Sequence, residues 1–408
     1  MTSIASLLAS LYRRTALGAE TRTRRLSRLT WGLTHPYVIT KLRGRTAGGA
    51  PPVSLAVVGT TQRAEYLAEM VLKDSPQRTL LGTVPLWSLP HRLEQLSQAV
   101  DLTVVRLHPQ LAGLLSSDRY LCVPEWVDQW LTMPPDPDLL CQGKSGKSLR
   151  RALRRARDSG ITCELSHSGA DLEEFYHTYH LPFVRCHFGS YARIDSLPIL
   201  RGLFEQGGLM WALHRGERVA GSVFTRQGTV LRLLTFATMA GRDDLTELGV
   251  HTALNWSEIK HAHTLGCQEM NFGGARGLLT DGVLRHKRKW HTTIVERGHS
   301  HLYLLRWETL NPAVCAMLAA APVVLRGKDH LAAVSLLDTR TPASQEVVTR
   351  AYRFLWTPGL GSLHLVCPSG FQEDVEAPPP TRLVAQASLG SGDLSALLRA
   401  GTPEHKPP

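Results

Sequence analysis

The sequence lacks several features that would assign it to a common class of protein. It contains no run of about 18 apolar residues, so no helix is predicted to span a membrane. Its seven cysteines form no C-x-x-C pair, which argues against a disulfide framework or a zinc ribbon, and no metal site is predicted. No secretion signal is recognisable at the start of the chain, and a cytoplasmic protein is therefore expected.

Acidic side chains are scarce in the first 50 residues. That segment holds nine basic residues and one acid, Glu20, and supplies +8 of the net charge of +11. Residues 1–50 are therefore predicted to be a basic N-terminal arm on a nearly neutral body. Such an arm suits peripheral contact with an anionic membrane or with nucleic acid, because clustered cations attract polyanions. A solvated leader is the alternative.

The remaining 358 residues show regular patterns. Residues 51–143 alternate strand and helix and predict a small α/β lobe. Residues 308–371 are expected to fold as a C-terminal extension. Residues 372–408, which are rich in proline, glycine and serine, are expected to be largely disordered. In the first lobe the expected elements are strands at Val53–Gly59 and Leu102–Leu107 and helices at Ala64–Lys73 and Leu93–Val100.

Residues 144–307 carry the most specific pattern. A helix at Ser148–Asp158 is predicted from its apolar stripe, with Ser148 as N-cap and five arginines on the other sides. A second helix is expected to end near a turn at Tyr179–Pro182. Hairpin strands, a helix and a last strand then follow. They are expected at Leu209–His214, Val219–Thr225, Val230–Phe236, Gly249–Thr264 and Glu269–Phe272.

Several stretches in this region carry a resemblance to a known family. They are Lys147–Arg151 with Arg154 and Arg155, Phe175–Tyr176 with Tyr179, Pro182 and Arg185, Asn271–Arg276, and the block Asp281–Trp290. On these residues the segment resembles the GNAT acyltransferases, in the branch that looks like the FemAB aminoacyltransferases and the BioF2-like (CelD/BcsL-type) acetyltransferases. The resemblance implies an α/β (α+β) GNAT acyl-CoA N-acyltransferase fold in a tandem arrangement. Residues 51–143 would be its degenerate N-terminal lobe.

The resemblance also implies a reaction class. The chain would be an enzyme, an acyltransferase that moves an acyl group from acyl-CoA or acetyl-CoA to an amine. The acceptor would be a small molecule or a precursor in cell-envelope or polysaccharide metabolism. One feature departs from the family: the glycine-rich loop that cradles the phosphates of coenzyme A is replaced by the predicted turn Asp244–Gly249, with one glycine and two acids.

Nine residues are candidates for the site. The resemblance aligns Lys287 with the family lysine, whose fixed charge would meet donor phosphate or developing negative charge, and it places Tyr176 and Tyr179 on the acceptor side as further catalytic candidates. Arg276 follows a Gly-Gly bend where backbone can approach a ligand closely. The expected substrate- and cofactor-binding residues are Arg276, Arg185, Gly249, Gly273, Gly274 and Lys289. No general base stands out.

Two other functions stay open. Five arginines within Arg150–Arg157, together with Lys144 and Lys147, suit the phosphates of tRNA, which would make the chain an aminoacyl-tRNA-dependent aminoacyltransferase. A GNAT-like binding or scaffold protein without catalysis is the third reading, favoured by the altered donor turn. The sequence does not fix an oligomeric state.

Overall fold

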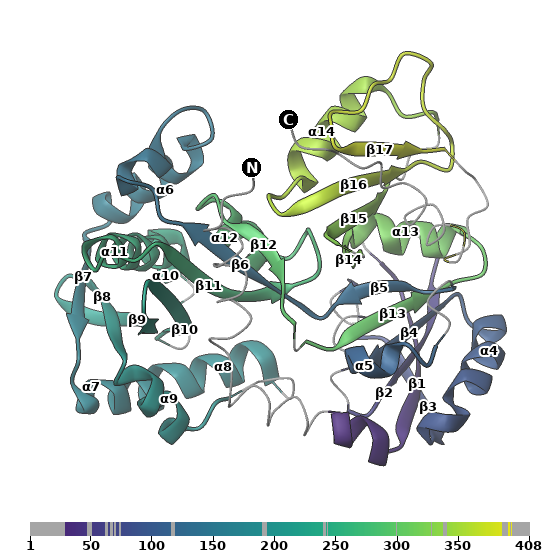
Figure 1. Ribbon diagram of the computed structural model, residues 1–408, viewed down its shortest axis with the longest axis horizontal. Helices are drawn as coiled ribbons and strands as arrows, with labels where there is room; N and C mark the ends of the chain where they lie inside the picture. Colours follow the sequence, from purple (N-terminus) through teal and green to yellow (C-terminus); the bar gives the residue numbers. More distant parts are fainter. Residues whose placement is uncertain are drawn as a thin grey trace.

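The computed structural model describes residues 29–46, 51–61, 64–65, 68, 71–72, 75–115, 119–189, 194–239, 242, 244–298, 300–327, 329–337, 341–385, 391 and 393. Strands in this part of the chain form three sheets, of six, seven and four strands (Figure 1). No helix within the described ranges is both long and apolar enough to cross a membrane. The first 28 residues, which make up most of the predicted basic arm, lie outside the described residues.

The first sheet has the strand order β3-β1-β2-β4-β13-β5. Its strands β2 and β4 are short apolar runs that lie parallel to each other, as expected for strands covered on both faces. Helix α4 (Leu89–Ala99) covers one face and α13 (Pro312–Ala320) covers the other. The strands are β1 (Tyr37–Gly44), β2 (Val53–Gly59), β3 (Gln77–Val84), β4 (Leu102–Leu107), β5 (Leu121–Pro124) and β13 (Leu302–Arg306).

The second sheet has the order β12-β6-β11-β10-β9-β8-β7. Only β10 and β11 are parallel, and all other neighbours are antiparallel. The strands are β6 (Trp126–Thr132), β7 (Ile161–Ser166), β8 (Gly207–His214), β9 (Glu217–Gln227), β10 (Val230–Thr238), β11 (Glu269–Arg276) and β12 (Thr293–Glu296).

Helices cover both faces of this sheet (Figure 1). On one face α6 (Lys147–Asp158) buries Leu149 and Ala156, and α11 (Val250–Thr264) lies beside it in the same apolar cluster. The other face carries α7 (Gly169–Glu174), α8 (Leu181–Phe188) and α9 (Leu197–Phe204). A π-helical segment, Phe175–His180, joins α7 to α8 without a break.

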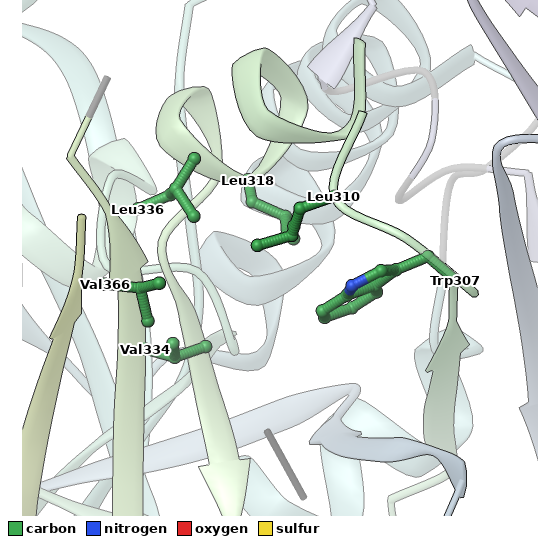
Figure 2. Close-up of a pocket in the computed structure, with 6 residues that line it drawn as sticks. All are labelled: Trp307, Leu310, Leu318, Val334, Leu336 and Val366. Carbon is green, nitrogen blue, oxygen red and sulfur yellow. The ribbon is translucent and has the colours of Figure 1, made fainter. Parts of the chain in front are cut away.

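The third sheet, β14-β15-β16-β17, lies at the top of Figure 1 with helix α14 (Gln345–Leu355). Its strands are β14 (Val323–Arg326), β15 (Leu331–Leu336), β16 (Leu360–Val366) and β17 (Thr381–Val384). A small cavity between this sheet, α13 and the end of β13 is lined only by apolar side chains (Figure 2). An apolar cavity of this kind holds no ordered water, so it is a packing defect rather than a ligand site. Its lining residues are Trp307, Leu310, Leu318, Val334, Leu336 and Val366.

The mixed α/β fold class predicted from the sequence is confirmed, and β2 and β4 have the predicted bounds. The predicted limits at residues 50, 143, 307 and 371 do not separate the three sheets. β1 and β13 both belong to the first sheet, β6 belongs to the second, and β17 pairs with β16 although disorder is predicted there. Each of these strands pairs with a partner that local sequence patterns do not identify.

Three local predictions are wrong. Helix α6 begins at Lys147 after Gly146, so Ser148 is not its N-cap. The predicted turn at Tyr179–Pro182 is helical, because Pro182 sits in the first turn of α8, where the proline nitrogen needs no hydrogen-bond partner. The predicted donor turn is a short helix, α10 (Asp244–Leu248).

Candidate active site

The two parallel strands of the second sheet, β10 and β11, are paired only at their beginnings. Val230–Arg232 pairs with Glu269–Asn271, after which β10 continues along β9 and β11 continues along β6. No ladder bond joins β10 to β11 beyond those residues. The centre of the sheet therefore contains a place where the backbone groups of two strands are not satisfied by each other.

A bulge in β11 lies at the same level. Its register with β6 shifts between Asn271 and Gly274, and Gly273 has a φ of +75°, which a residue with a side chain rarely adopts. The Asn271 Oδ1 accepts a 2.6 Å hydrogen bond from the Gly273 nitrogen and stabilises the bulge. Gly273, one of the glycines expected at the site, therefore has a geometric reason to be glycine.

Helix α12 (Gly282–Arg288) follows β11 and carries Lys287. Its N-cap is Asp281, whose Oδ1 accepts a 2.8 Å bond from the Leu284 nitrogen. The Lys287 Nζ donates a 2.9 Å hydrogen bond to the Gly274 carbonyl oxygen. The structure thus brings Lys287 together with Gly273 and Gly274.

Two arginines at the end of α12 attach this helix to α14 and to the residues that follow α14. The Arg285 guanidinium carbon lies 4.5 Å from the centre of the Phe354 ring on α14. Arg288 donates to the carbonyl oxygens of Phe354 and Trp356 at 2.8 and 3.0 Å. The C-terminal sheet module therefore holds the helix that presents Lys287 to β11.

Lys287 is partly buried and has an altered acidity. Burial and the nearby Arg297 lower its pKa to about 8, while Asp128 and Asp281 oppose that change. The lysine forms no ion pair with any carboxylate in the described part of the chain, since its recorded partner is the Gly274 carbonyl. At pH 7 it carries a proton that is held less tightly than that of a solvent-exposed lysine.

Two histidines are stacked close to Lys287. The ring of His251, on the first turn of α11, lies 4.2 Å from that of His286 on α12 and 4.2 Å from that of Phe236 on β10. Burial, with help from Lys289 and Lys287, lowers the pKa of His286 to about 4, and burial lowers that of His251 well below its usual value. Both imidazoles are therefore neutral at pH 7.

A buried polar group lies behind this stack. Asn255 of α11 can be oriented so that its nitrogen donates to Glu258 Oε2 and its oxygen accepts from Trp290 Nε1, each at 3.2 Å. Burial raises the pKa of Glu258 to about 8, so the carboxyl is protonated at pH 7. The closing tryptophan of the Asp281–Trp290 block is thereby bonded to the central helix.

Gly249 lies at the start of α11, where the sequence predicts the donor turn. It has a φ of +87°, and a Cβ added there would lie 3.2 Å from the Cβ of Ala156 on α6. A glycine is thus required for the close approach of α6 to the amino end of α11. Nearby Asp244 of α10 is paired with Arg242 at 2.8 Å.

Helix α6 carries exposed cations beside this point. Arg157 is paired with Asp158 at 3.4 Å, and Arg150 donates to the carbonyl oxygens of Cys141 and Gly143. Three other arginines have no acidic partner within the described ranges of the chain: Arg151, Arg154 and Arg155. A positive surface therefore adjoins the amino end of α11.

The other predicted residues lie in different settings. Arg276, at the end of β11, has its Nη1 3.4 Å from Glu125 Oε1 and its guanidinium carbon 3.9 Å from the centre of the Trp126 ring. Lys289 is exposed at the end of α12, and Arg185 is exposed on α8. The roles of these three residues in binding stay predictions.

Tyr176 and Tyr179 lie in the π-helical segment on the opposite face of the sheet from α11. Both rings are buried among aromatic and apolar side chains, including Phe175 and Trp211. The Tyr176 hydroxyl donates to the Asp195 carbonyl oxygen at 3.1 Å and the Tyr179 hydroxyl donates to the Arg218 carbonyl oxygen at 2.8 Å. Each hydroxyl is thus committed to backbone, and a catalytic role for them stays a prediction.

Sequence patterns do not identify the groups that surround Lys287. Asp128 of β6, Arg297 after β12, and His286 are close to it in space, but only His286 lies in a recognised motif. A lone aspartate within the strand Trp126–Thr132 was the available signal, since a charged residue in an apolar strand usually has a specific partner.

One protein-family model matches the part of the chain that contains Lys287. The family model described as the acetyltransferase (GNAT) domain matches residues 143–288, which include α6, α11, the bulge in β11 and Lys287. This segment is a GNAT acetyltransferase domain. The predicted recognition is therefore confirmed for this part of the chain, and β6 and β12 complete the sheet of the GNAT domain from outside the matched residues.

Solved structures also resemble the chain. They include the C-terminal domain of a putative lysylphosphatidylglycerol synthetase from Agrobacterium fabrum (12% identity, 70% of this chain and 90% of that chain, TM-score 0.33). L-PGS from Bacillus licheniformis (15%, 72% and 91%, TM-score 0.32) and FemX (13%, 68% and 90%, TM-score 0.34) are similar to a comparable degree. Likenesses at this level carry no conclusion about activity. Among curated proteins, none matches the sequence.

Proposed function

We propose that this chain is an N-acyltransferase of the FemAB-like kind that transfers an acyl group from acyl-CoA to an amine. The observation that carries the proposal is the position of Lys287, whose Nζ is bonded to the bulge of β11 where β11 leaves β10. The GNAT domain assignment gives the reaction class. The donor and the acceptor are the new elements of the proposal.

The separation of β10 from β11 beyond their first residues favours an extended donor molecule that carries amide groups. Backbone donors and acceptors that lack a strand partner are suited to such a ligand, which can add to a strand edge through its own amides. The pantetheine arm of coenzyme A has two amides and fits this description. Its phosphates would lie toward the amino end of α11, where the helix dipole and the arginines of α6 are positive.

The chemistry needs few side chains. The amine nitrogen of the acceptor bonds to the acyl carbon, the carbon–sulfur bond breaks, and the amine loses a proton while the thiolate gains one. Lys287 is placed to stabilise negative charge on the acyl oxygen or on the departing sulfur. With neutral His251 and His286 beside it, no second cation is fixed between Lys287 and α11 at pH 7.

An aminoacyl-tRNA donor is the second candidate, and α6 is the observation that favours it. Arg151 and Arg155 are four residues apart on one flank of α6, with Lys147 one turn earlier. Like charges at this spacing destabilise a helix by about 0.2–0.5 kcal/mol per pair. A polyanion that binds this flank would relieve the repulsion and would place its donor group near the amino end of α11 in the same domain.

Thermal unfolding in the presence of coenzyme A, acetyl-CoA and longer acyl-CoAs tests the donor. A ligand that binds only the native state stabilises it by about 2.7 kcal/mol at a hundredfold excess over its Kd, so a saturable rise in Tm is expected. The absence of a shift with every CoA ester would contradict the acyl-CoA proposal.

A salt series with tRNA tests the alternative. For tRNA binding, replacement of Arg151, Arg154 and Arg155 by glutamine should weaken binding and flatten its dependence on salt concentration. An unchanged slope would exclude this use of α6. If neither CoA esters nor tRNA bind, the non-catalytic reading takes the place of both.

A further inference from the structure

We infer that Arg297, held by Asp128, is a positioning residue that sets the pH range in which Lys287 gives up its proton. Its meaning for catalysis rests on the proposed acyl transfer, whereas the effect on Lys287 is a property of the folded chain and can be measured without turnover.

The placement of Arg297 follows from three adjacent strands. Asp128 of β6 pairs with Gly274 of β11 on one side and with Val295 of β12 on the other. Arg297 follows β12 directly, and its Nε and Nη2 donate to Asp128 Oδ1 at 2.8 and 2.5 Å. Two donors on one carboxylate oxygen fix the plane of the guanidinium over β6.

Gly274 leaves room for that guanidinium. A Cβ at residue 274 would lie only 3.0 Å from the Arg297 Nη2 and 3.1 Å from its Cζ. The carbonyl oxygen of the same glycine accepts the hydrogen bond from Lys287 Nζ. Both cations therefore contact Gly274: Lys287 donates a hydrogen bond to its carbonyl oxygen, and the Arg297 guanidinium packs against its Cα.

The charges that face Lys287 come from several elements. Arg297 approaches from the end of β12, Asp128 from β6, and Asp281 from the start of α12. His251 and His286 also face it, but burial keeps both neutral at pH 7. The two carboxylates favour the protonated lysine, while burial and Arg297 disfavour it, and the resulting pKa is about 8.

Removal of the Arg297 charge should change the pKa of Lys287 in one direction only. Without a positive neighbour, the pKa of Lys287 rises toward the ordinary lysine value, and the group stays a fixed cation throughout the neutral range. With Arg297 in place, Lys287 can return a proton to a leaving group near neutral pH. A general acid with a pKa near the working pH transfers protons most effectively.

The test is the pH profile of Lys287 acetylation by acetic anhydride, followed by peptide mass spectrometry on the full-length protein. If Arg297→Gln raises the pKa of Lys287 by about one unit, the free amine at pH 8 and the acetylation rate fall about fivefold. Arg297→Lys keeps the charge and should restore most of the wild-type profile. Arg326→Gln, which removes an arginine paired with Glu296 at 3.1 Å, is the matched control and should leave the profile unchanged.

Several outcomes would overturn the inference. A midpoint that does not move in Arg297→Gln, or faster acetylation in all variants, would mean that Arg297 only packs the site. Should Arg297→Gln fail to fold, Gly274→Ala provides the second variant, because its methyl group displaces the guanidinium and should raise the midpoint. A shifted midpoint in a protein that binds no acyl donor would leave this inference intact and defeat the proposed function.

Discussion

Two charge clusters, whose carboxylates Glu125 and Asp128 are close together in the chain at the start of β6, differ in how their charges are compensated. The first, here called the junction cluster, centres on Glu125 and includes Arg106, Arg276 and His301. The second, the lysine cluster, contains Lys287, Arg297 and Asp128. In the junction cluster the carboxylate is paired with Arg106 and Arg276 and lies 3.6 Å from the His301 Nδ1. In the lysine cluster Asp128 forms its ion pair with Arg297, whereas Lys287 donates a hydrogen bond to the uncharged Gly274 carbonyl oxygen.

This difference separates a charge that stabilises the fold from a charge that can still interact with a substrate. Glu125 is 5% exposed. Burial alone would raise its pKa, but Arg106 and His301 lower that pKa to about 2. This carboxylate links the first and second sheets, because it pairs with Arg106 of β4 and Arg276 of β11. Lys287 has no carboxylate partner among the residues that the structure describes, so a substrate group can interact with it without breaking an ion pair there.

Loss of Glu125 should give the largest change in stability. Glu125→Gln leaves the buried Arg106 without its carboxylate, and breaking a buried pair on one side costs about 3–5 kcal/mol. Urea unfolding measures the difference. Glu94→Gln is the matched control, since its side chain is 46% exposed and also bonded to two arginines. A loss equal to that of the control would show that Glu125 is not a structural centre.

A buried carboxyl with no cation extends the comparison. The pKa of Glu258 is about 8 in the folded protein, above its usual value, so the native state holds a proton that the unfolded state has lost between pH 4.5 and 8. Stability should therefore fall as pH rises through that range, by about 1.4 kcal/mol per pH unit for this group. Glu258→Gln should remove this part of the pH dependence of the unfolding free energy. Parallel curves for the two proteins would contradict the assignment.

The smallest effect is expected at Tyr179. Tyr179→Phe removes one hydrogen bond to the Arg218 carbonyl and should cost about 1 kcal/mol in chemical denaturation. Tyr176→Phe, which loses the bond to Asp195, should behave in the same way. If the two hydroxyls only stabilise the fold, turnover survives in both variants. A large loss of turnover without a loss of stability would instead support the catalytic role predicted from the sequence.

The sequence predicts the acyltransferase core well because its signals are local. The apolar stripe of α6, the hairpin strands β8–β10 and the Asp281–Trp290 block are each readable within a short window. The contact of Lys287 with β11 is also local, since the bulge and α12 are close together in the chain, although the sequence patterns do not by themselves predict it.

The rest depends on contacts between distant residues. β6 enters the second sheet between β11 and β12 from more than a hundred residues away, so neither Asp128 nor its pairing with Arg297 is visible locally. Arg276 has the features of a ligand-binding arginine in the sequence, but its partner Glu125 is 151 positions away. The tyrosines of Phe175–His180 match the family motif, whereas their hydroxyl partners depend on packing against β9 and on the residues before α9.

The most direct test of the account is thiol release from acetyl-CoA, followed with a panel of small amines, by the wild-type protein and by Lys287→Met. The methionine variant keeps the length of the side chain and removes the charge, so it should retain its Tm within a few degrees and lose at least about a hundredfold in turnover. Lys260→Met, which removes an exposed lysine on α11 that has no expected role in the site, should retain activity. Equal thiol release by wild type and Lys287→Met would contradict the central claim.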